Sequence, residues 1–216
     1  MSDLFENWAR LNQQIKTDQN KICLVAVSKY ASVDAIKALY ALGARDFGES
    51  KVQEALEKMD LLPKDINWHF IGRIQSNKIN KIIGRFSLIH SIADVKTACE
   101  ISKKCEEKKI IQDVLLQVNL SKENTKQGFS EDELISTLPL ILSLKGIRIK
   151  GLMTMGPMKE NEEMIKACFL RLKALRDELK SKYPFVEFLS MGMSGDYQLA
   201  IASGATHLRI GSLLFS

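Results

Sequence analysis

Residues 22–48, ICLVAVSKYASVDAIKALYALGARDFG, contain a strand, a helix and a second strand, and this unit decides the fold. The apolar run at 22–27, rich in β-branched residues, predicts a buried strand. Residues 32–42 have the spacing of an amphipathic helix, for which Ser32 is the expected N-cap. A short strand is predicted at 45–48. Strands that alternate with helices are typical of α/β folds with a parallel sheet.

The same alternation continues to the end of the chain. Further strands are predicted at 67–71, 86–90, 110–119, 147–153, 185–190 and 206–210, and further helices at 51–59, 76–83, 94–108, 134–144, 160–180 and 196–203. Eight strands with seven intervening helices predict an α/β fold of the single (β/α)8, TIM-barrel type over residues 1–216. An extra N-terminal helix at 3–16 could cover the gap beside the last strand. A doubly wound open sheet is the alternative, which eight regular units without a composition break disfavour.

Composition is that of one soluble domain. The chain has 216 residues, of which 45% are hydrophobic and 26% charged. Its net charge of +5 is too modest and too spread out to predict a nucleic-acid partner. No apolar segment is long enough for a membrane span and no leader is recognisable, so a cytoplasmic location is expected. The four cysteines form no C-x-x-C pair, so free thiols are expected, without disulfides or a metal site.

Lys29 is the first candidate functional residue. Barrel enzymes place their working groups at the carboxyl ends of the strands, and Lys29 directly follows the first predicted strand. Desolvation at the barrel mouth makes an amine a better nucleophile toward an aldehyde. A lysine that turns out into solvent is an equally acceptable interpretation of its position.

Two glycine- and serine-containing loops occupy the positions where such barrels hold phosphate. Ser194 lies between Gly192 and Gly195 after the seventh strand, and Gly211-Ser212 follows the eighth. Backbone N–H groups at such turns suit a phosphate dianion. Arg209, beside the second loop, could form a strand-end salt bridge or face the ring nitrogen of a pyridine cofactor.

Seven motifs along the chain match one known family. They are, in order, AVSK (26–29), FGE (47–49), WHFIG (68–72), QSNK (75–78), GLM (151–153), MGMS (191–194) and RIG (209–211). Together they resemble the YggS/PROSC family of pyridoxal 5′-phosphate (PLP) homeostasis proteins. The resemblance extends from the first strand to the last residue. It implies a barrel of the alanine racemase N-terminal domain kind, without the racemases' second domain.

The resemblance also implies roles for particular residues. Lys29 would hold PLP as a Schiff base, and Arg209 would face the pyridine nitrogen. Ser194, Gly211 and Ser212 would hold the phosphate group. Met153 and Ser50 are included as cofactor contacts, although the family commonly has asparagine where this chain has Ser50. No catalytic residue and no metal ligand is predicted.

The function implied is intracellular buffering or delivery of PLP, with apo forms of PLP-dependent enzymes as possible recipients. A monomer is expected. A weak PLP-dependent racemase or lyase is the alternative, but racemisation needs a base on each face of the substrate, and Tyr30 is expected to point away from Lys29. A phosphosugar aldolase or isomerase without PLP is a third interpretation. His69 and His90 are interpreted as core residues or as supports behind the site, and Lys126 as a candidate second PLP contact or transfer lysine.

Overall fold

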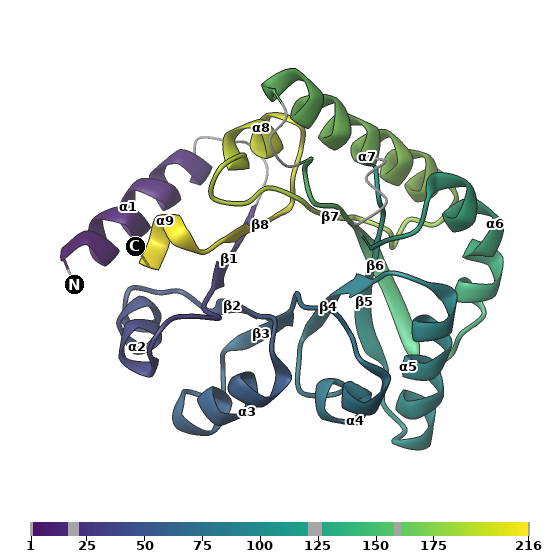
Figure 1. The fold of residues 1–216 in the computed structure, drawn as a ribbon, viewed down its shortest axis with the longest axis horizontal. Helices are drawn as coiled ribbons and strands as arrows, with labels where there is room; N and C mark the ends of the chain where they lie inside the picture. The colour runs from purple at the N-terminus through teal and green to yellow at the C-terminus, as the bar shows by residue number, and fades with distance from the viewer. Residues whose placement is uncertain (1, 17–21, 121–126, 158–160, 216) are drawn as a thin grey trace.

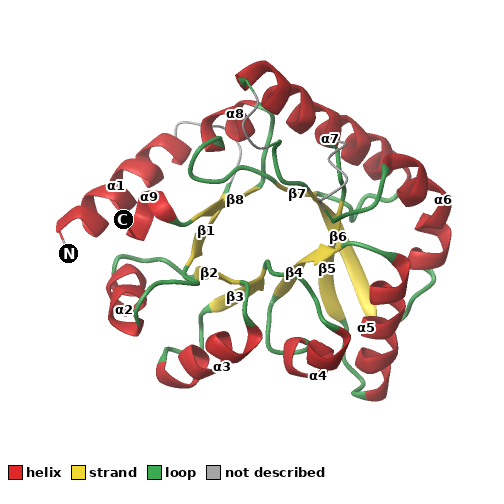
Figure 2. Cartoon of the chain, in the orientation of Figure 1, coloured by secondary structure: helices red, strands yellow, loops and turns green. Residues whose placement is uncertain are grey.

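The structure, a computed structural model, describes residues 2–16, 22–120, 127–157 and 161–215. Eight parallel strands close into a barrel in chain order, with the helices on its outside (Figures 1 and 2). The strands are β1 Cys23–Val27, β2 Asp46–Glu49, β3 Asn67–Phe70, β4 Leu88–Ile92, β5 Gln112–Gln117, β6 Ile147–Met153, β7 Phe188–Ser190 and β8 His207–Ile210. The (β/α)8 prediction is therefore confirmed, and the open sheet was the wrong alternative.

Helices α1 to α8 follow the predicted order with shifted ends, and α9 was not predicted. They are α1 Ser2–Lys16, α2 Val33–Ala41, α3 Val52–Leu61, α4 Ile79–Ile82, α5 Val95–Glu107, α6 Glu131–Leu142, α7 Glu162–Lys182, α8 Tyr197–Ala202 and α9 Ser212–Phe215. Ser32 caps α2 as predicted, because its hydroxyl accepts from the Ala35 N–H at 3.2 Å. The helix predicted at 76–83 is instead a 3₁₀ turn, Ser76–Lys78, followed by α4.

The N-terminal helix covers the place where the barrel closes. Figure 1 shows α1 beside α9, outside β8 and β1, and the two helices are in contact. Leu11 on α1 is fully buried, and the Trp8 indole donates to the Leu42 carbonyl at 3.1 Å. The Tyr197 hydroxyl donates to Gln14 at 2.8 Å, which ties α8 to the same helix. The predicted covering role of this helix is confirmed.

Apolar and polar side chains are divided between the outside and the inside of the barrel. Outward-facing residues such as Phe47 and Leu208 pack under the helices in one large apolar cluster. A smaller cluster of Leu88, Leu115 and Met153 fills one side of the interior. The interior also contains a polar group of buried side chains, namely His69, His90, Ser190, His207 and Arg209. None of the helices in the described ranges has the length and apolar character required to cross a membrane.

Candidate cofactor site

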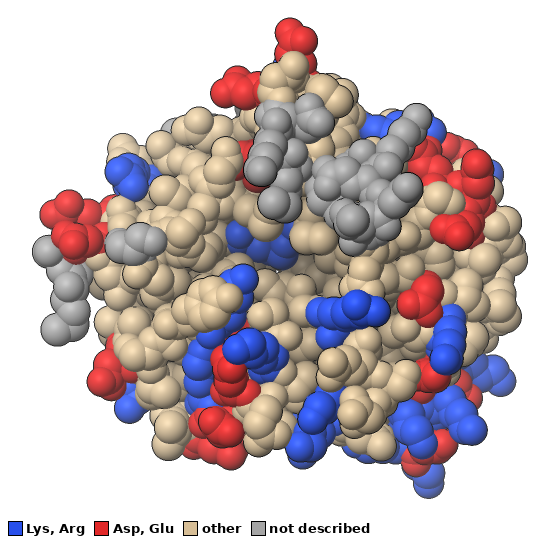
Figure 3. Space-filling view, viewed as in Figure 1, with Lys and Arg blue, Asp and Glu red and all other residues tan. Residues whose placement is uncertain are grey.

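A cavity of about 780 Å³ lies at the carboxyl ends of the strands. Its lining includes six of the seven predicted site residues, namely Lys29, Ser50, Ser194, Arg209, Gly211 and Ser212. Apolar side chains such as Val27, Ile71 and Met155 complete the wall. Figure 3 shows a hollow at the middle of the barrel, with Lys or Arg side chains in it and along one side. The size and mixed lining suit a small organic ligand.

Lys29 enters this cavity from the end of β1. Its side chain is half-buried, and its Nζ lies 5.0 Å from the centre of the Tyr30 ring. The expectation that Tyr30 points away from Lys29 is therefore wrong, and both residues line the cavity. The preceding residue, Ser28, is buried and donates from its hydroxyl to Glu49 Oε1 at 2.7 Å. Lys58 on α3 donates to the same oxygen at 2.8 Å and to the Ser28 carbonyl at 2.7 Å. These bonds hold the exits of β1 and β2 together beneath Lys29.

Arg209 contributes a buried positive charge to the cavity. Its Nη1 donates to Ser190 Oγ at 2.6 Å and its Nη2 to the Thr154 carbonyl at 3.0 Å. Burial lowers the pKa of Arg209 to about 10, against the opposing influence of Asp196, so the guanidinium stays protonated at neutral pH. No ion pair between described residues includes Arg209, so the alternative of a strand-end salt bridge is not observed. A buried cation without a carboxylate is costly, and a ligand acceptor in the cavity would relieve that cost.

The loops after β7 and β8 meet at another part of the cavity. Ser194 Oγ accepts from the Gly211 N–H at 3.4 Å and from the Leu213 N–H at 3.3 Å. Its hydroxyl proton therefore remains available to a ligand. The backbone N–H groups of Gly195 and Ser212 make no hydrogen bond within the part of the chain that the structure describes. Together these donors form a concave group suited to an anion.

Gly192 is required by the shape of the first of these loops. Its φ is +91°, in the left-handed region that other residues rarely adopt. A Cβ at this position would also lie 2.5 Å from the Ala200 side chain. Only glycine permits both the turn and the close approach of α8, and this places Ser194 at the cavity wall.

A hydrogen-bonded chain runs from Arg209 down the barrel interior. Arg209 can only donate, so Ser190 Oγ accepts a hydrogen bond from it. The Ser190 hydroxyl in turn donates a hydrogen bond to His90 Nδ1 at 2.8 Å. His90 Nε2 then donates to His69 Nδ1 at 2.9 Å, and His69 Nε2 donates to Asp46 Oδ1 at 3.0 Å. This assignment satisfies every atom with two neutral imidazoles and an ionised Asp46. The chain fixes the orientation of Arg209 toward the cavity.

Sequence reasoning found only part of this arrangement. His69 and His90 are buried in the core, as expected, but Asp46, Thr154 and Ser190 were not singled out. Their signal was the alternation of strand residues, which predicts that Asp46 and Ser190 point inward.

The predictions for Met153 and Lys126 have different outcomes. Met153 does not line the cavity, because its side chain lies deeper in the barrel against Leu88 and Leu115, while Met155 reaches the wall. Lys126 lies outside the described residues.

The buried histidines predict lower stability in acid. Burial lowers the pKa of His207 to about 3, and that of His90 is lowered by the same cause. Between the unfolded value near pH 6.5 and the folded value, only the unfolded chain takes up the proton, so stability falls as pH falls. We expect His207 alone to reduce the free energy of unfolding by about 2 kcal/mol between pH 7.5 and pH 5. Urea unfolding at both pH values tests this, and His207→Gln should have a shallower pH dependence than the wild type.

Known proteins are similar to this chain in both sequence and fold. A family model described as the N-terminal domain of alanine racemase matches residues 1–216. The pyridoxal phosphate homeostasis protein of Aquifex aeolicus (strain VF5) is 39% identical, with 100% of this chain and 95% of that protein covered. The protein of the same name from Synechocystis sp. is 42% identical, with 93% and 94% covered. The solved structure of PipY from Synechococcus elongatus with PLP bound has a TM-score of 0.90 and 35% identity, and covers 99% of this chain and 100% of its own.

Proposed function

This chain belongs to the family of pyridoxal phosphate homeostasis proteins, and from this premise we propose that it binds PLP as a Schiff base on Lys29 in order to buffer or deliver the cofactor. The observation that carries the proposal is the convergence of Lys29, Arg209 and Ser194 on one cavity. Apo forms of PLP-dependent enzymes in the cytoplasm are the proposed recipients. The chain is proposed to act as a single domain and as a monomer.

The cavity offers a partner for the aldehyde, the pyridine nitrogen and the phosphate of PLP. Lys29 supplies an amine for the aldehyde, and Arg209 supplies N–H donors for the pyridine nitrogen. The Ser194 hydroxyl and the N–H groups of Gly195 and Ser212 would bind the phosphate. Ser50 also lines the cavity and would contact the ring or its substituents. Bound PLP would supply an electrophilic aldehyde and an electron-withdrawing ring.

Arg209 supports storage of the cofactor in preference to turnover. An arginine whose pKa stays near 10 donates a hydrogen bond to the pyridine nitrogen but does not give up its proton. A ring nitrogen that stays unprotonated withdraws electrons less strongly than one paired with a carboxylate. Among the described lining residues, Lys29 and Tyr30 are the candidates for a base that acts on a bound amino acid, and Tyr30 is 83% exposed.

The proposal is tested on the purified protein loaded with PLP. We expect a visible or near-ultraviolet absorption that changes on borohydride treatment, and a reduced pyridoxyl group on Lys29 in peptide mapping. The loaded protein should also restore activity to an apo PLP-dependent enzyme placed across a dialysis membrane or mixed with it. A protein that takes up no PLP, or that is labelled only on other lysines, would contradict the proposal.

Ser194→Ala should weaken PLP binding by about 1–2 kcal/mol, because one charge-assisted hydrogen bond to the phosphate is lost. Equilibrium titration of wild type and variant with PLP measures this difference. Titration with pyridoxal, which has no phosphate, is the control and should not distinguish the two proteins. An equal loss for both ligands would indicate that Ser194 acts through the loop structure alone.

A weak racemase remains the second candidate function, because Tyr30 lies in the cavity wall beside Lys29. A base on the opposite face of a bound amino acid would permit exchange of its α-proton. Incubation of the PLP-loaded protein with L- and D-alanine in deuterated water distinguishes the two functions. Our proposal expects no exchange above that of free PLP, whereas a racemase would label both enantiomers.

A further inference from the structure

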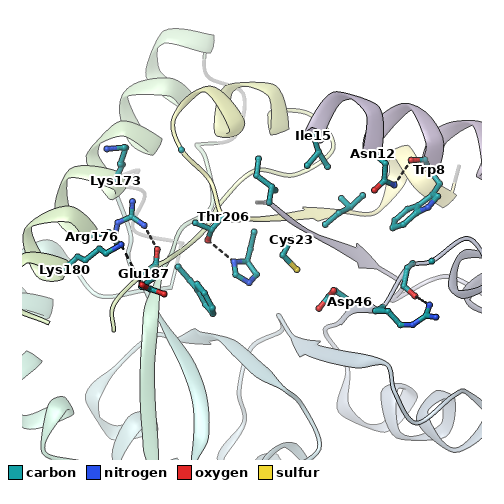
Figure 4. A pocket seen from close by; sticks show the side chains of 18 residues that line it. Trp8, Asn12, Ile15, Cys23, Asp46, Lys173, Arg176, Lys180, Glu187 and Thr206 are labelled. Atoms are coloured by element: carbon teal, nitrogen blue, oxygen red, sulfur yellow. Dashed lines mark hydrogen bonds and ion pairs between the residues drawn. The ribbon is translucent and has the colours of Figure 1, made fainter. Parts of the chain in front are cut away.

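A second cavity, of about 950 Å³, lies at the opposite, amino end of the barrel (Figure 4). Side chains of α1 border it on one side and those of α7 on the other, as the positions of Trp8 and Lys173 show. Cys23 and Asp46 line its inner wall. The cofactor proposal makes no use of this cavity.

Three potential metal ligands meet at this wall. The Cys23 sulfur, an Asp46 carboxylate oxygen and a His69 ring nitrogen all lie within 4.8 Å of one another. They come from the adjacent strands β1, β2 and β3, so their backbone positions are held by the barrel. Zinc ligands stand about 2.0–2.3 Å from the ion, and atoms this close to one another can reach such distances by small side-chain rotations.

We propose that Cys23, Asp46 and His69 bind a zinc-class divalent cation, with water from the cavity completing the coordination. Sulfur, nitrogen and oxygen donors together favour zinc over magnesium or calcium, which prefer oxygen alone. Cys23 and Asp46 border the open cavity, so an ion can enter without unfolding of the barrel. The spacing of the cysteines predicted no metal site, because these ligands are separated by whole strand–helix units and meet only in the folded barrel.

The basic residues that line the cavity are paired with carboxylates. Lys173 and Arg176 on α7 both pair with Asp177, at 2.6 and 2.7 Å. Lys180 lies 3.9 Å from Glu187. These three basic groups share the two carboxylates of Asp177 and Glu187, and Arg45 at the rim pairs with Asp65 at 3.2 Å. Asp46 would carry its negative charge directly to the metal.

Coordination would reverse the hydrogen-bonded chain inside the barrel. A cation bound by His69 Nε2 takes the lone pair of that atom, so the single ring proton must move to Nδ1. Nδ1 would then donate to His90 Nε2, the reverse of the direction assigned without metal. The ring proton of His90 would then move from Nε2 to Nδ1, which would donate to Ser190 Oγ in place of accepting from it. Cys23 loses its thiol proton to solvent when the metal–sulfur bond forms.

Zinc binding is tested by titration of the PLP-free and PLP-loaded protein with Zn²⁺ against a chromophoric chelator. The wild type should bind one equivalent of Zn²⁺, and Cys23→Ser should bind it at least ~100-fold more weakly. Loss of a residue that only supports a metal ligand typically reduces metal affinity by about 10–100-fold, so loss of a ligand itself should reach or exceed that range. Cys99→Ser is the matched control, because Cys99 is also a half-buried free thiol but lies on α5. It should bind as the wild type does.

Nitrogen-15 NMR of histidine gives a second readout that needs no variant of the site. The chain has only three histidines, so selective labelling yields three ring systems. Addition of Zn²⁺ should remove the proton from His69 Nε2 and place it on Nδ1. The proposal fails if the wild type binds no more tightly than Cys23→Ser, if Cys99→Ser loses the ion, or if Zn²⁺ binds while the His69 ring is unchanged.

Discussion

Lys29→Ala is expected to abolish the covalent attachment of PLP, with borohydride labelling falling from near one group per chain to background. Lys29 is the only lysine among the described residues that line the cofactor cavity. Arg209 and Ser194 are untouched by the change, so weak binding of PLP through its phosphate and ring should persist. Intact mass after borohydride reduction measures the covalent fraction, and equilibrium dialysis measures the remaining non-covalent binding.

A second lysine provides the control for this experiment. Lys51 follows the second strand, but its side chain is 60% exposed and pairs with Glu54 at 2.7 Å. Lys51→Ala should therefore be labelled as fully as the wild type. Labelling of Lys29→Ala at another single lysine, to the same extent as the wild type, would show that the cavity does not direct the reaction.

Site residues that directly follow a strand could be predicted from the sequence, because each is recognised from its own neighbours along the chain. Lys29 directly follows an apolar run, and Ser194 and Gly211 lie in loops that begin where strands end. In a parallel barrel all such exits are at the same end, so strand order alone brings these residues together. The position of Ser32 before a helical stretch likewise predicts a helix start, and its side chain acts as the cap.

Contacts across the barrel could not be predicted in the same way. His90 and Ser190 are 100 residues apart, and their bond depends on the tilt of the strands and on which layer each side chain occupies. The sequence also does not show how far along the barrel axis a side chain lies. Met153 points into the barrel, as its position in the strand predicts, but it lies below the cavity, against Leu88 and Leu115. Helix α6 begins before the predicted residue 134, because Ser130 and Glu133 form a capping box at its start.

Lys58→Met is expected to produce the largest loss of stability, about 3–5 kcal/mol in the free energy of unfolding. Glu49 is completely buried, and Lys58 is its only charged partner among the described ion pairs. One of its oxygens, Oε2, already has no hydrogen-bond partner in the described part of the chain. Removal of the ammonium group would leave the carboxylate with only the Ser28 hydroxyl. Urea unfolding at pH 7.5 of wild type and variant gives the difference.

The double variant Glu49→Gln, Lys58→Met separates the cost of an unpaired charge from the cost of lost packing. With both charges removed, the side-chain amide introduced at position 49 can still accept from the Ser28 hydroxyl, so the double variant should recover more than half of the stability that Lys58→Met loses. If the single and double variants are equally unstable, the charge of Glu49 is not the cause.

Because Lys58 also binds the Ser28 carbonyl directly before Lys29, Lys58→Met should slow covalent PLP uptake even where the protein remains folded.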